Sequence, residues 1–345
     1  RKTEQKRARE EREREEQAER HWRPRRLQDI TEKEDSECES TWITWNCNGL
    51  KRCTTTVDGT HALRQVVEQT GSEVILLQET QTRHRHRHPK IDQMGDYIVY
   101  HSSLPAKKTR TGKRRDVMTH QAHNKAGVMT LVHHRLSPER NVERVTEPTH
   151  LLGYALALRF STSRGSFLLI NAYIPPTSGG EEKREGRRKL MGGITGWLKE
   201  VRKNGEPVIM GGDMNAVWLK DDRSSDVGLT RADEEYKSWA RSIGLGPLDT
   251  ERRQDPRQRT YESRSTVRTG GHMGATSRID DWLVDGLGKT EEIIGTPETH
   301  PDLPHTSDHH PLTLKTDVRS LGIEVDRGWQ SRHTRNKREK KRMKK

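Results

Sequence analysis

Short apolar runs alternate with polar, glycine-bearing segments through the middle of the chain. Runs of this length that are rich in Val, Ile, Leu and Trp predict strands. Two other stretches, 61–69 and 181–203, predict helices, the second of them on the surface. This mixed order of elements predicts two β-sheets packed face to face with helices outside. The predicted strands are residues 41–46, 73–78, 127–132, 152–160, 166–173, 207–211, 279–284 and 312–315.

The two ends of the chain differ from its middle in charge. Residues 1–27 carry a formal net charge of +4 and residues 327–345 one of +9, which together equal the +13 of the whole chain. Residues 28–326 are therefore formally neutral, and the basicity belongs to the ends. We predict a charged N-terminal arm (1–39), one large central domain (40–317) and a basic C-terminal tail (318–345).

The charged ends allow more than one interpretation. Residues 4–20 mix Glu and Arg without an apolar stripe, which predicts a solvated helix or a disordered arm. The lysine-rich run 337–342 predicts phosphate binding or a nuclear address, and a merely solvated tail has the same composition. The alternating Arg and His of residues 83–88 favour a phosphate-binding loop over a metal site, because arginines repel a cation.

Composition excludes several classes of protein. No apolar run reaches membrane-spanning length, and the start of the chain has no secretory pattern, so no membrane partner is expected. The cysteines Cys38, Cys47 and Cys53 match neither a disulfide framework nor a zinc spacing, which favours reduced thiols inside the cell. The first residue is Arg1, so we expect a processed chain or a fragment of a larger product, such as a polyprotein.

Five short motifs whose residues could take part in catalysis follow one another along the chain. Phosphodiester hydrolysis needs neutralised phosphate oxygens, an activated water and a stabilised leaving oxygen. Taken singly, each motif is equally compatible with a turn, a helix cap or an exposed strand end. Their joint appearance in one order favours catalysis. The motifs are W-N-C-N-G-L at 45–50, L-Q-E-T at 77–80, G-D-M-N at 212–215, R-I-D at 278–280 and S-D-H at 307–309.

The residue types suggest which residues bind metal and which transfer protons. Oxygen ligands suit Mg²⁺ or Mn²⁺, and Glu79 together with Asp308 or Asn48 are the candidates. Asp213 and His309 are the candidates for a base or a water-positioning group. A catalytic histidine needs a carboxylate to fix its tautomer, and Asp280 is the favoured partner.

This ordered set resembles the endonuclease/exonuclease/phosphatase superfamily, the DNase I-like hydrolases. Within it the chain is most similar to the branch of exonuclease III, AP endonucleases and the endonuclease domains of non-LTR (LINE-type) retrotransposons. The resemblance spans about residues 40 to 317 and implies a four-layer α/β sandwich, in which two packed mixed sheets are flanked by helices.

The resemblance also implies roles for individual residues. On the metal side, Glu79 would be the principal ligand, with Asn46, Asn48 and Asp308 close to metal and phosphate. On the catalytic side, all the matching residues would surround the scissile phosphate. Tyr173 would contact it, Asn215 would hold it, Asp213 would activate or orient water, and Asp280 would support His309 on the phosphate.

Two departures from the abasic-site enzymes affect the expected substrate. Pro176 stands where those enzymes often have a phosphate-contacting asparagine, and Ser277 stands where they often have a tryptophan that walls the abasic pocket. We therefore predict a Mg²⁺-dependent DNA endonuclease of the retrotransposon type, which nicks duplex DNA and leaves a 3′-hydroxyl. A reverse transcriptase in the same polyprotein is an expected partner, and the expected location is the nucleus.

Other functions stay open at this point. AP-type repair endonuclease is the main alternative, and a non-catalytic nucleic-acid-binding protein is a further one. RNA deadenylase, phosphoinositide phosphatase and sphingomyelinase activities share the core motifs, although the basic ends favour nucleic acid. The polar segments 107–125 and 252–274 are predicted loops, and in a nuclease the loops select the substrate.

Overall fold

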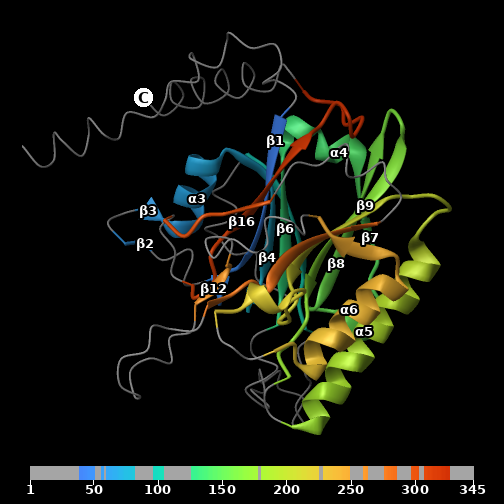
Figure 1. Ribbon diagram of the computed structural model, residues 1–345. Coiled ribbons are helices and arrows are strands. Elements are labelled where there is room, and N and C mark those ends of the chain that lie inside the picture. Colours follow the sequence, from blue (N-terminus) through green and yellow to red (C-terminus); the bar gives the residue numbers. More distant parts are fainter. Residues whose placement is uncertain are drawn as a thin grey trace, which may run out of the picture. The chain divides into compact units, whose positions relative to one another are not determined.

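The described part of the chain forms two six-stranded sheets packed face to face between helices (Figure 1). The computed structural model describes residues 39–50, 56–57, 60–81, 96–104, 126–177, 180–224, 228–248, 259–262, 276–285, 297–302 and 307–326. Several predicted features lie outside the described residues. They are the arm up to residue 38 with Cys38, Cys53, the Arg-His run 83–88, the loop 107–125, most of the loop 252–274, and the basic run 337–342.

The first sheet combines strands from both ends of the described chain. Its order is β15 (Glu298–Thr299), β16 (Leu312–Asp317), β1 (Glu39–Asn46), β4 (Ser72–Gln78), β6 (Val128–His133) and β5 (Tyr97–Ser102). Strands β1 and β4 are parallel, with Asn46 opposite Gln78, whereas β6 runs antiparallel to both β4 and β5. The chain therefore leaves β1 and β4 at the same edge.

The second sheet is built from the middle of the chain. Its order is β11 (Leu245–Pro247), β14 (Asp280–Asp285), β10 (Val208–Asp213), β9 (Gly165–Tyr173), β8 (Ala155–Thr162) and β7 (Val142–Val145). Strands β9 and β10 are parallel, with Tyr173 opposite Asp213, and β14 begins antiparallel to β10 with Asp280 opposite Asp213. Three polar side chains thus meet at one edge of this sheet.

Three of the described helices form the outer layers. Helix α3 (Ala62–Thr70) packs on the first sheet through Leu63 and Val66, beside Ile43, Trp45 and Leu77. Helices α5 (Glu181–Val201) and α6 (Arg231–Ser242) lie side by side on the second sheet (Figure 1), where the Trp239 indole donates to the Met191 carbonyl of α5. Among the described helices, none is long and apolar enough to cross a membrane.

Shorter elements complete the described chain. Strands are connected by the helix α4 (Pro138–Asn141) and the 3₁₀ turns η4 (His134–Leu136) and η5 (Thr149–Leu151). A third 3₁₀ turn, η6 (Lys220–Asp222), lies between β10 and α6. Two small antiparallel ribbons pair β2 (Thr56–Val57) with β3 (Thr60–His61) and β12 (Tyr261–Glu262) with β13 (Thr276–Ser277).

The space between the sheets is filled by large apolar side chains. Trp42 of the first sheet stacks on Phe160 and Phe167 of the second, with ring centroids 6.2 Å apart in both pairs. Val318, Leu321 and Ile323, which follow β16, are buried in the same cluster. Burial of apolar surface on this scale is the main stabilisation of such a fold.

The four-layer sandwich predicted from the sequence is confirmed, and each predicted strand and helix is present with its bounds moved by a few residues. The largest shift is in the predicted strand 152–160, which begins only at Ala155 because Gly153 turns the chain with φ +81°. Within the two sheets and the outer helices, the prediction missed β5, β7, β11, β15 and α6. Strand β7, V-E-R-V, is an exposed edge without alternating hydrophobicity, and α6 has few apolar residues.

Candidate active site

The predicted catalytic residues gather where strands of the two sheets end. Asn46 ends β1, and Glu79 directly follows β4, its parallel neighbour. Tyr173 ends β9, Asp213 ends β10, and Asp280 begins β14. The parallel pairing within each sheet brings side chains that are far apart in sequence to one edge.

The backbone turns sharply where the chain leaves these strands. Asn48, Glu79 and Asn215 adopt left-handed conformations, with φ between 45° and 49°. Such conformations are uncommon outside glycine and concentrate at functional sites. Gly212 is required for a different reason, because a Cβ there would lie 1.9 Å from the Ala172 carbonyl oxygen of the neighbouring strand. The glycine of G-D-M-N therefore permits the close approach of β9 and β10.

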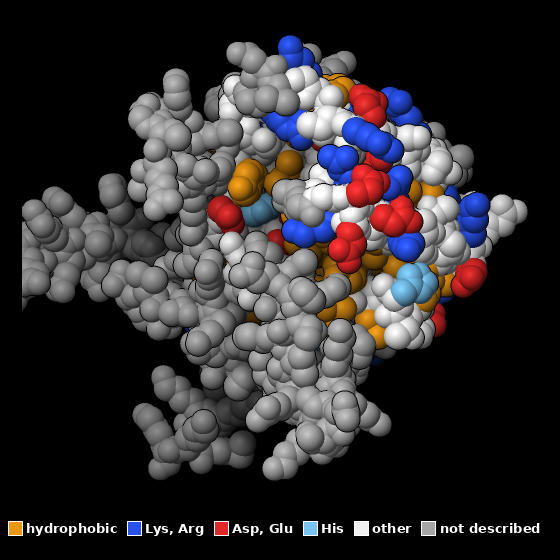
Figure 2. All heavy atoms as spheres, turned by 90° about the horizontal axis from the view of Figure 1, so that it is seen from below, with side chains coloured by type: hydrophobic (Ala, Val, Ile, Leu, Met, Phe, Trp, Pro, Cys, Tyr) orange, Lys and Arg blue, Asp and Glu red, His pale blue; other side chains and the backbone are white. Residues whose placement is uncertain are grey.

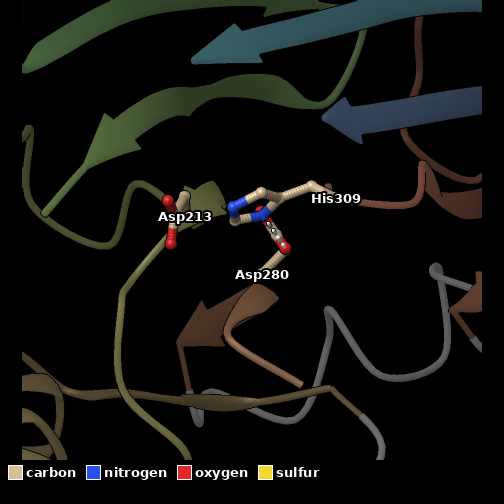
Figure 3. Close-up of side chains that lie close together, drawn as sticks. All are labelled: Asp213, Asp280 and His309. Carbon is tan, nitrogen blue, oxygen red and sulfur yellow. Dashed lines mark hydrogen bonds and ion pairs between the residues drawn. The ribbon is translucent and has the colours of Figure 1, made fainter. Parts of the chain in front are cut away.

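His309 and Asp280 form a buried hydrogen-bonded pair (Figure 3). Nδ1 of His309 lies 2.8 Å from Oδ2 of Asp280. Burial alone would lower the pKa of His309, but the charge and the hydrogen bond of Asp280 outweigh it and raise this pKa to about 9. The raised pKa favours the charged imidazole, which the Asp280 carboxylate stabilises.

The loop that carries His309 is anchored to β1. The Trp45 indole donates to the His309 carbonyl at 3.0 Å, and the His309 amide donates to Ser307 Oγ at 3.1 Å. Ser307 in turn donates to the Asn46 carbonyl at 2.7 Å. The serine of S-D-H is thus a fixed part of the loop.

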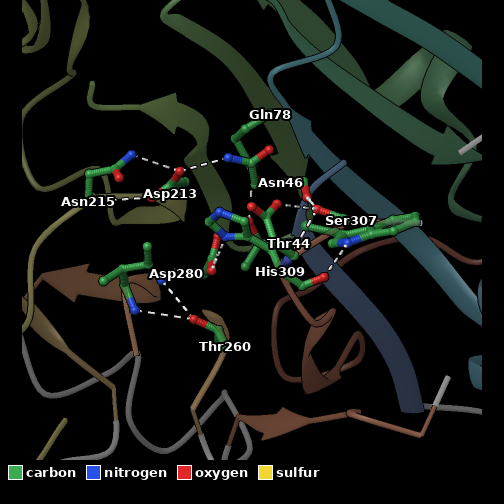
Figure 4. Close-up of polar contacts among 12 residues, drawn as sticks. Thr44, Asn46, Gln78, Asp213, Asn215, Thr260, Asp280, Ser307 and His309 are labelled. Atoms are coloured by element: carbon green, nitrogen blue, oxygen red, sulfur yellow. Dashed lines mark hydrogen bonds and ion pairs between the residues drawn. The ribbon is translucent and has the colours of Figure 1, made fainter. Parts of the chain in front are cut away.

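Asp213 is fully buried and accepts hydrogen bonds from two asparagines (Figure 4). The side-chain amides of Asn46 and Asn215 both donate to Oδ2 at 2.8 Å, and the Asn215 backbone amide donates to Oδ1 at 2.9 Å. Burial and the nearby Asp280 carboxylate raise the pKa of Asp213 to about 7. A carboxylate of this basicity can accept a proton from water near neutral pH.

Asp213, Asp280 and His309 are also close enough together to share an ion. Their ligand atoms lie within 4.8 Å of one another. The Nδ1 atom of His309 is, however, already directed at Asp280. This arrangement is typical of an oriented acid–base pair as well as of a metal centre. The metal ligands predicted from the sequence are other residues.

The predicted metal ligands offer carboxylate and amide oxygen atoms. Glu79 is 4% exposed, and its carboxylate accepts from the Tyr173 hydroxyl at 2.9 Å. The Asn48 side-chain amide donates to Asp308 at 3.0 Å, and the Asn48 backbone amide donates to the Asn46 side-chain carbonyl at 3.0 Å. Carboxylate and amide oxygens fit a hard divalent cation. Burial, with the charges of Glu79 and Asp213, raises the pKa of Tyr173, so its phenol stays a donor.

The sequence analysis missed Thr260, which supports the His309–Asp280 pair. Its Oγ1 accepts from the Ile279 and Asp280 amides at 3.2 and 3.0 Å, and its carbonyl accepts from the His310 amide (Figure 4). The following Tyr261 ring lies 5.0 Å from the His309 ring, and Tyr261 pairs with Ser277. No sequence signal marks Thr260, because a lone threonine in a polar segment resembles any turn residue.

The sequence analysis also missed Gln78 and Asn171, which join the two sheets beneath the site. The Gln78 amide donates to Asn171 at 2.8 Å and to Thr44 at 3.0 Å, and the Asn171 amide donates to the Met129 carbonyl at 2.9 Å. Gln78 precedes Glu79, and Asn171 lies two residues before Tyr173. These bonds connect the strand that carries the predicted ligand with the strand that carries the predicted phosphate contact.

Comparison with known proteins identifies a family and a similar fold. Residues 43–309 match the model of the Endonuclease/Exonuclease/phosphatase family. Among solved structures, the chain is similar to the crystal structure of the AP endonuclease LMAP from Leishmania major, with a TM-score of 0.62 and 16% identity over 82% of this chain and 89% of that one. At this identity the likeness shows the fold. Among curated proteins, no sequence matches the chain significantly.

Proposed function

The chain belongs to the endonuclease/exonuclease/phosphatase family, and on that premise we propose that it is a divalent-metal-dependent DNA endonuclease. It nicks duplex DNA and leaves a 3′-hydroxyl. The observation that carries this proposal is the buried group in which Asp213, oriented by two asparagines, lies close to His309, which is hydrogen-bonded to Asp280. This group supplies a proton acceptor and a cation, which phosphodiester hydrolysis requires together.

In the proposed mechanism, Asp213 accepts a proton from the water whose oxygen attacks phosphorus. His309, held through Nδ1 by Asp280, presents its other ring nitrogen to a non-bridging oxygen and stabilises the charge that develops there. The P–O3′ bond breaks, the phosphate stays on the 5′ oxygen of the downstream strand, and the departing 3′ oxygen takes up a proton from solvent. Mg²⁺ or Mn²⁺, held by Glu79 with Asn48 and Asp308, would supply Lewis-acid charge to the phosphate.

Two positions support undamaged duplex as the substrate. Pro176 is exposed and has no side-chain amide, and Ser277 contributes no ring beside Tyr261. A site that recognises a flipped abasic sugar needs a pocket that recovers the unstacking energy. These two positions therefore support the retrotransposon-type function over AP endonuclease activity, which the similar Leishmania protein is named for.

The charge of the described surface supports binding through the basic ends. On the face shown in Figure 2, Lys and Arg side chains are interspersed with Asp and Glu side chains. A mixed surface of this kind gives little non-specific attraction for phosphate, whereas the run 337–342 is strongly basic. We propose that the tail supplies affinity for DNA and a nuclear address. A reverse transcriptase that extends the 3′-hydroxyl would be the natural partner.

The test is a nicking assay on supercoiled plasmid with Mg²⁺, with Mn²⁺ and with a chelator. Parallel reactions use an abasic duplex and single-stranded RNA. We expect metal-dependent nicking of the plasmid, and nicks that a DNA polymerase extends directly because they end in a 3′-hydroxyl. DNA binding without nicking would favour the non-catalytic alternative, and exclusive cleavage of RNA would contradict the DNA substrate.

A further inference from the structure

Helix α5 buries an arginine in its apolar stripe. Arg187 is 1% exposed, whereas its neighbour Arg188 points outward and pairs with Glu181 and Glu185. Desolvating a charged group is costly, so a buried arginine is retained only where specific partners compensate for it. The buried positions on α5 are Arg187, Leu190, Met191, Ile194, Trp197 and Leu198.

The guanidinium of Arg187 binds the backbone of both loops that leave β9 and β10. Nη1 donates to the Pro175 carbonyl at 2.8 Å and, at a longer 3.5 Å, to the Asn215 carbonyl. Nη2 donates to the Met214 carbonyl at 2.9 Å. Pro175 lies two residues after Tyr173, and Met214 directly follows Asp213. The planar guanidinium of Arg187 therefore bridges the loop that follows Tyr173 and the loop that follows Asp213.

Asn215 joins the same two loops on the side that faces the site. Its side-chain amide donates to the Ile174 carbonyl at 3.1 Å and to Asp213 at 2.8 Å. Arg187 therefore binds the loops from the helix side, and Asn215 binds them from the side of the site. A lysine could not replace the arginine, because an ammonium is a point charge without the planar fork.

Charge gives a second reason for an arginine here. Asp213 lies beside the carboxylates of Asp280 and Glu79, and the charge of His309 offsets their repulsion only in part. Burial lowers the pKa of Arg187, and the Asp213 carboxylate acts in the opposite direction. A buried cation behind these carboxylates reduces their mutual repulsion.

We propose that Arg187 is a positioning residue for phosphodiester hydrolysis, which holds the β9 and β10 loops together and thereby fixes Asp213 and Asn215 relative to Tyr173. The inference rests on the proposed function, because it concerns the same site. Arg187 acts through the backbone and does not touch the substrate.

The chain offers two matched controls for the variant Arg187→Met, which removes the fork and the charge but keeps much of the volume. Arg188→Met removes a charge from the same helical turn. Arg159→Met removes another buried arginine, one that donates to Glu206 and to the Val201 carbonyl away from the site. We expect Arg187→Met to lower kcat about 100-fold, as a displacement of catalytic groups by about 1 Å can do, with KM for plasmid within about twofold of wild type. Both controls should keep wild-type kcat when assayed well below their own Tm.

A second variant, Arg187→Lys, keeps the charge and decides the question if Arg187→Met does not fold. It should regain only part of the lost kcat, because the charge without the fork bridges the loops poorly. Wild-type kcat in either Arg187 variant, or an equal loss in Arg159→Met, would overturn the inference while leaving the proposed function intact. Wild-type protein without metal-dependent nicking would overturn the proposed function, and this inference with it.

Discussion

The hydroxyl of Tyr173 donates a hydrogen bond of 2.9 Å to the carboxylate of Glu79. Tyr173 ends a strand of the second sheet, and Glu79 follows a strand of the first. The bond therefore links the predicted metal ligand to the predicted phosphate contact across the two sheets, and each partner can be tested separately.

Removing the Glu79 carboxylate should abolish most activity. Glu79→Ala deletes the charge that holds the cation beside the phosphate, so we expect a loss of at least about 100-fold that high Mg²⁺ does not restore. Plasmid nicking across a series of Mg²⁺ concentrations measures this. Nicking by the purified variant at the wild-type rate would refute the assignment of Glu79 as a ligand.

Tyr173→Phe should distinguish the contribution of the hydroxyl from that of the ring. The ring lies parallel to that of Tyr154, at a centroid distance of 6.3 Å and an interplanar angle of 4°, and phenylalanine can keep this contact. Loss of one hydrogen bond to a charged group is expected to lower kcat about 10- to 100-fold with little change in Tm. A large fall in Tm would show that the hydroxyl is mainly structural.

His309→Ala should lower kcat by at least about 100-fold with little effect on DNA binding, because its proposed role lies in the transition state. Asp280→Asn should give a smaller loss of the same kind, since it leaves the imidazole in place but weakens its charged form. Rate and binding affinity, measured on the same duplex, test this. Equal losses in both would point to a disordered site.

Asp233 has no assigned part in the chemical step and offers a test of stability. It accepts from Arg223 at 2.7 Å and caps helix α6 with Thr230, so Asp233→Ala should lower the free energy of unfolding by about 3 kcal/mol. Burial would raise the pKa of Asp233, but the hydrogen bonds from Arg223 and Thr230 outweigh it and hold this pKa below its ordinary value.

The sign of the pH dependence follows from that lowered pKa. The stabilisation by Asp233 is complete above the ordinary aspartate pKa of about 3.9 and declines as the pH falls below it, through the folded-state pKa. Denaturant unfolding of wild type and variant at neutral and acidic pH should show the difference shrinking only in acid. A difference that grows on acidification would contradict this.

Matched duplexes with and without a single abasic site decide between the two nuclease functions. The retrotransposon-type function predicts cleavage of undamaged duplex, biased toward flexible pyrimidine–purine steps or A-tract junctions. A preference in kcat/KM for the abasic duplex above about 1,000-fold, or roughly 4 kcal/mol of differential transition-state binding, would favour repair instead.

A truncation after residue 326 isolates the contribution of the basic tail. Its loss should flatten the dependence of log K on log salt while the cut-site pattern stays the same, because phosphate contacts give affinity without selectivity. Footprints of the cut sites at matched occupancy provide the control. A changed pattern would mean that the tail reads sequence or DNA shape.

The sequence was informative where local pattern and chemistry coincide. Apolar strands ending in Asn46, Glu79 and Asp213 could be placed because strand burial and the motif residues point to the same positions. Parallel pairing then predicts that such ends meet, as the Asn46–Gln78 and Tyr173–Asp213 registers show.

Contacts made by backbone groups were not predictable. Thr260 and Arg187 act on main-chain amides and carbonyls, which every residue has, so their partners leave no trace in the sequence. Strand β7 lacks alternating hydrophobicity because two charged residues stand side by side between its valines. These features depend on the assembled fold, as do the positions of loops around the site.

The strand order of the first sheet has a consequence for synthesis. Strand β16 pairs beside β1 although more than half of the chain separates them, and the loop before β16 carries His309. A nascent chain that already contains Glu79, Tyr173 and Asp213 therefore still lacks the histidine until that loop has left the ribosome. If the proposed function is right, partial translation products would be inert toward the nucleic acids around them, and proteolytic loss of the segment around β16 would inactivate the enzyme in one cut.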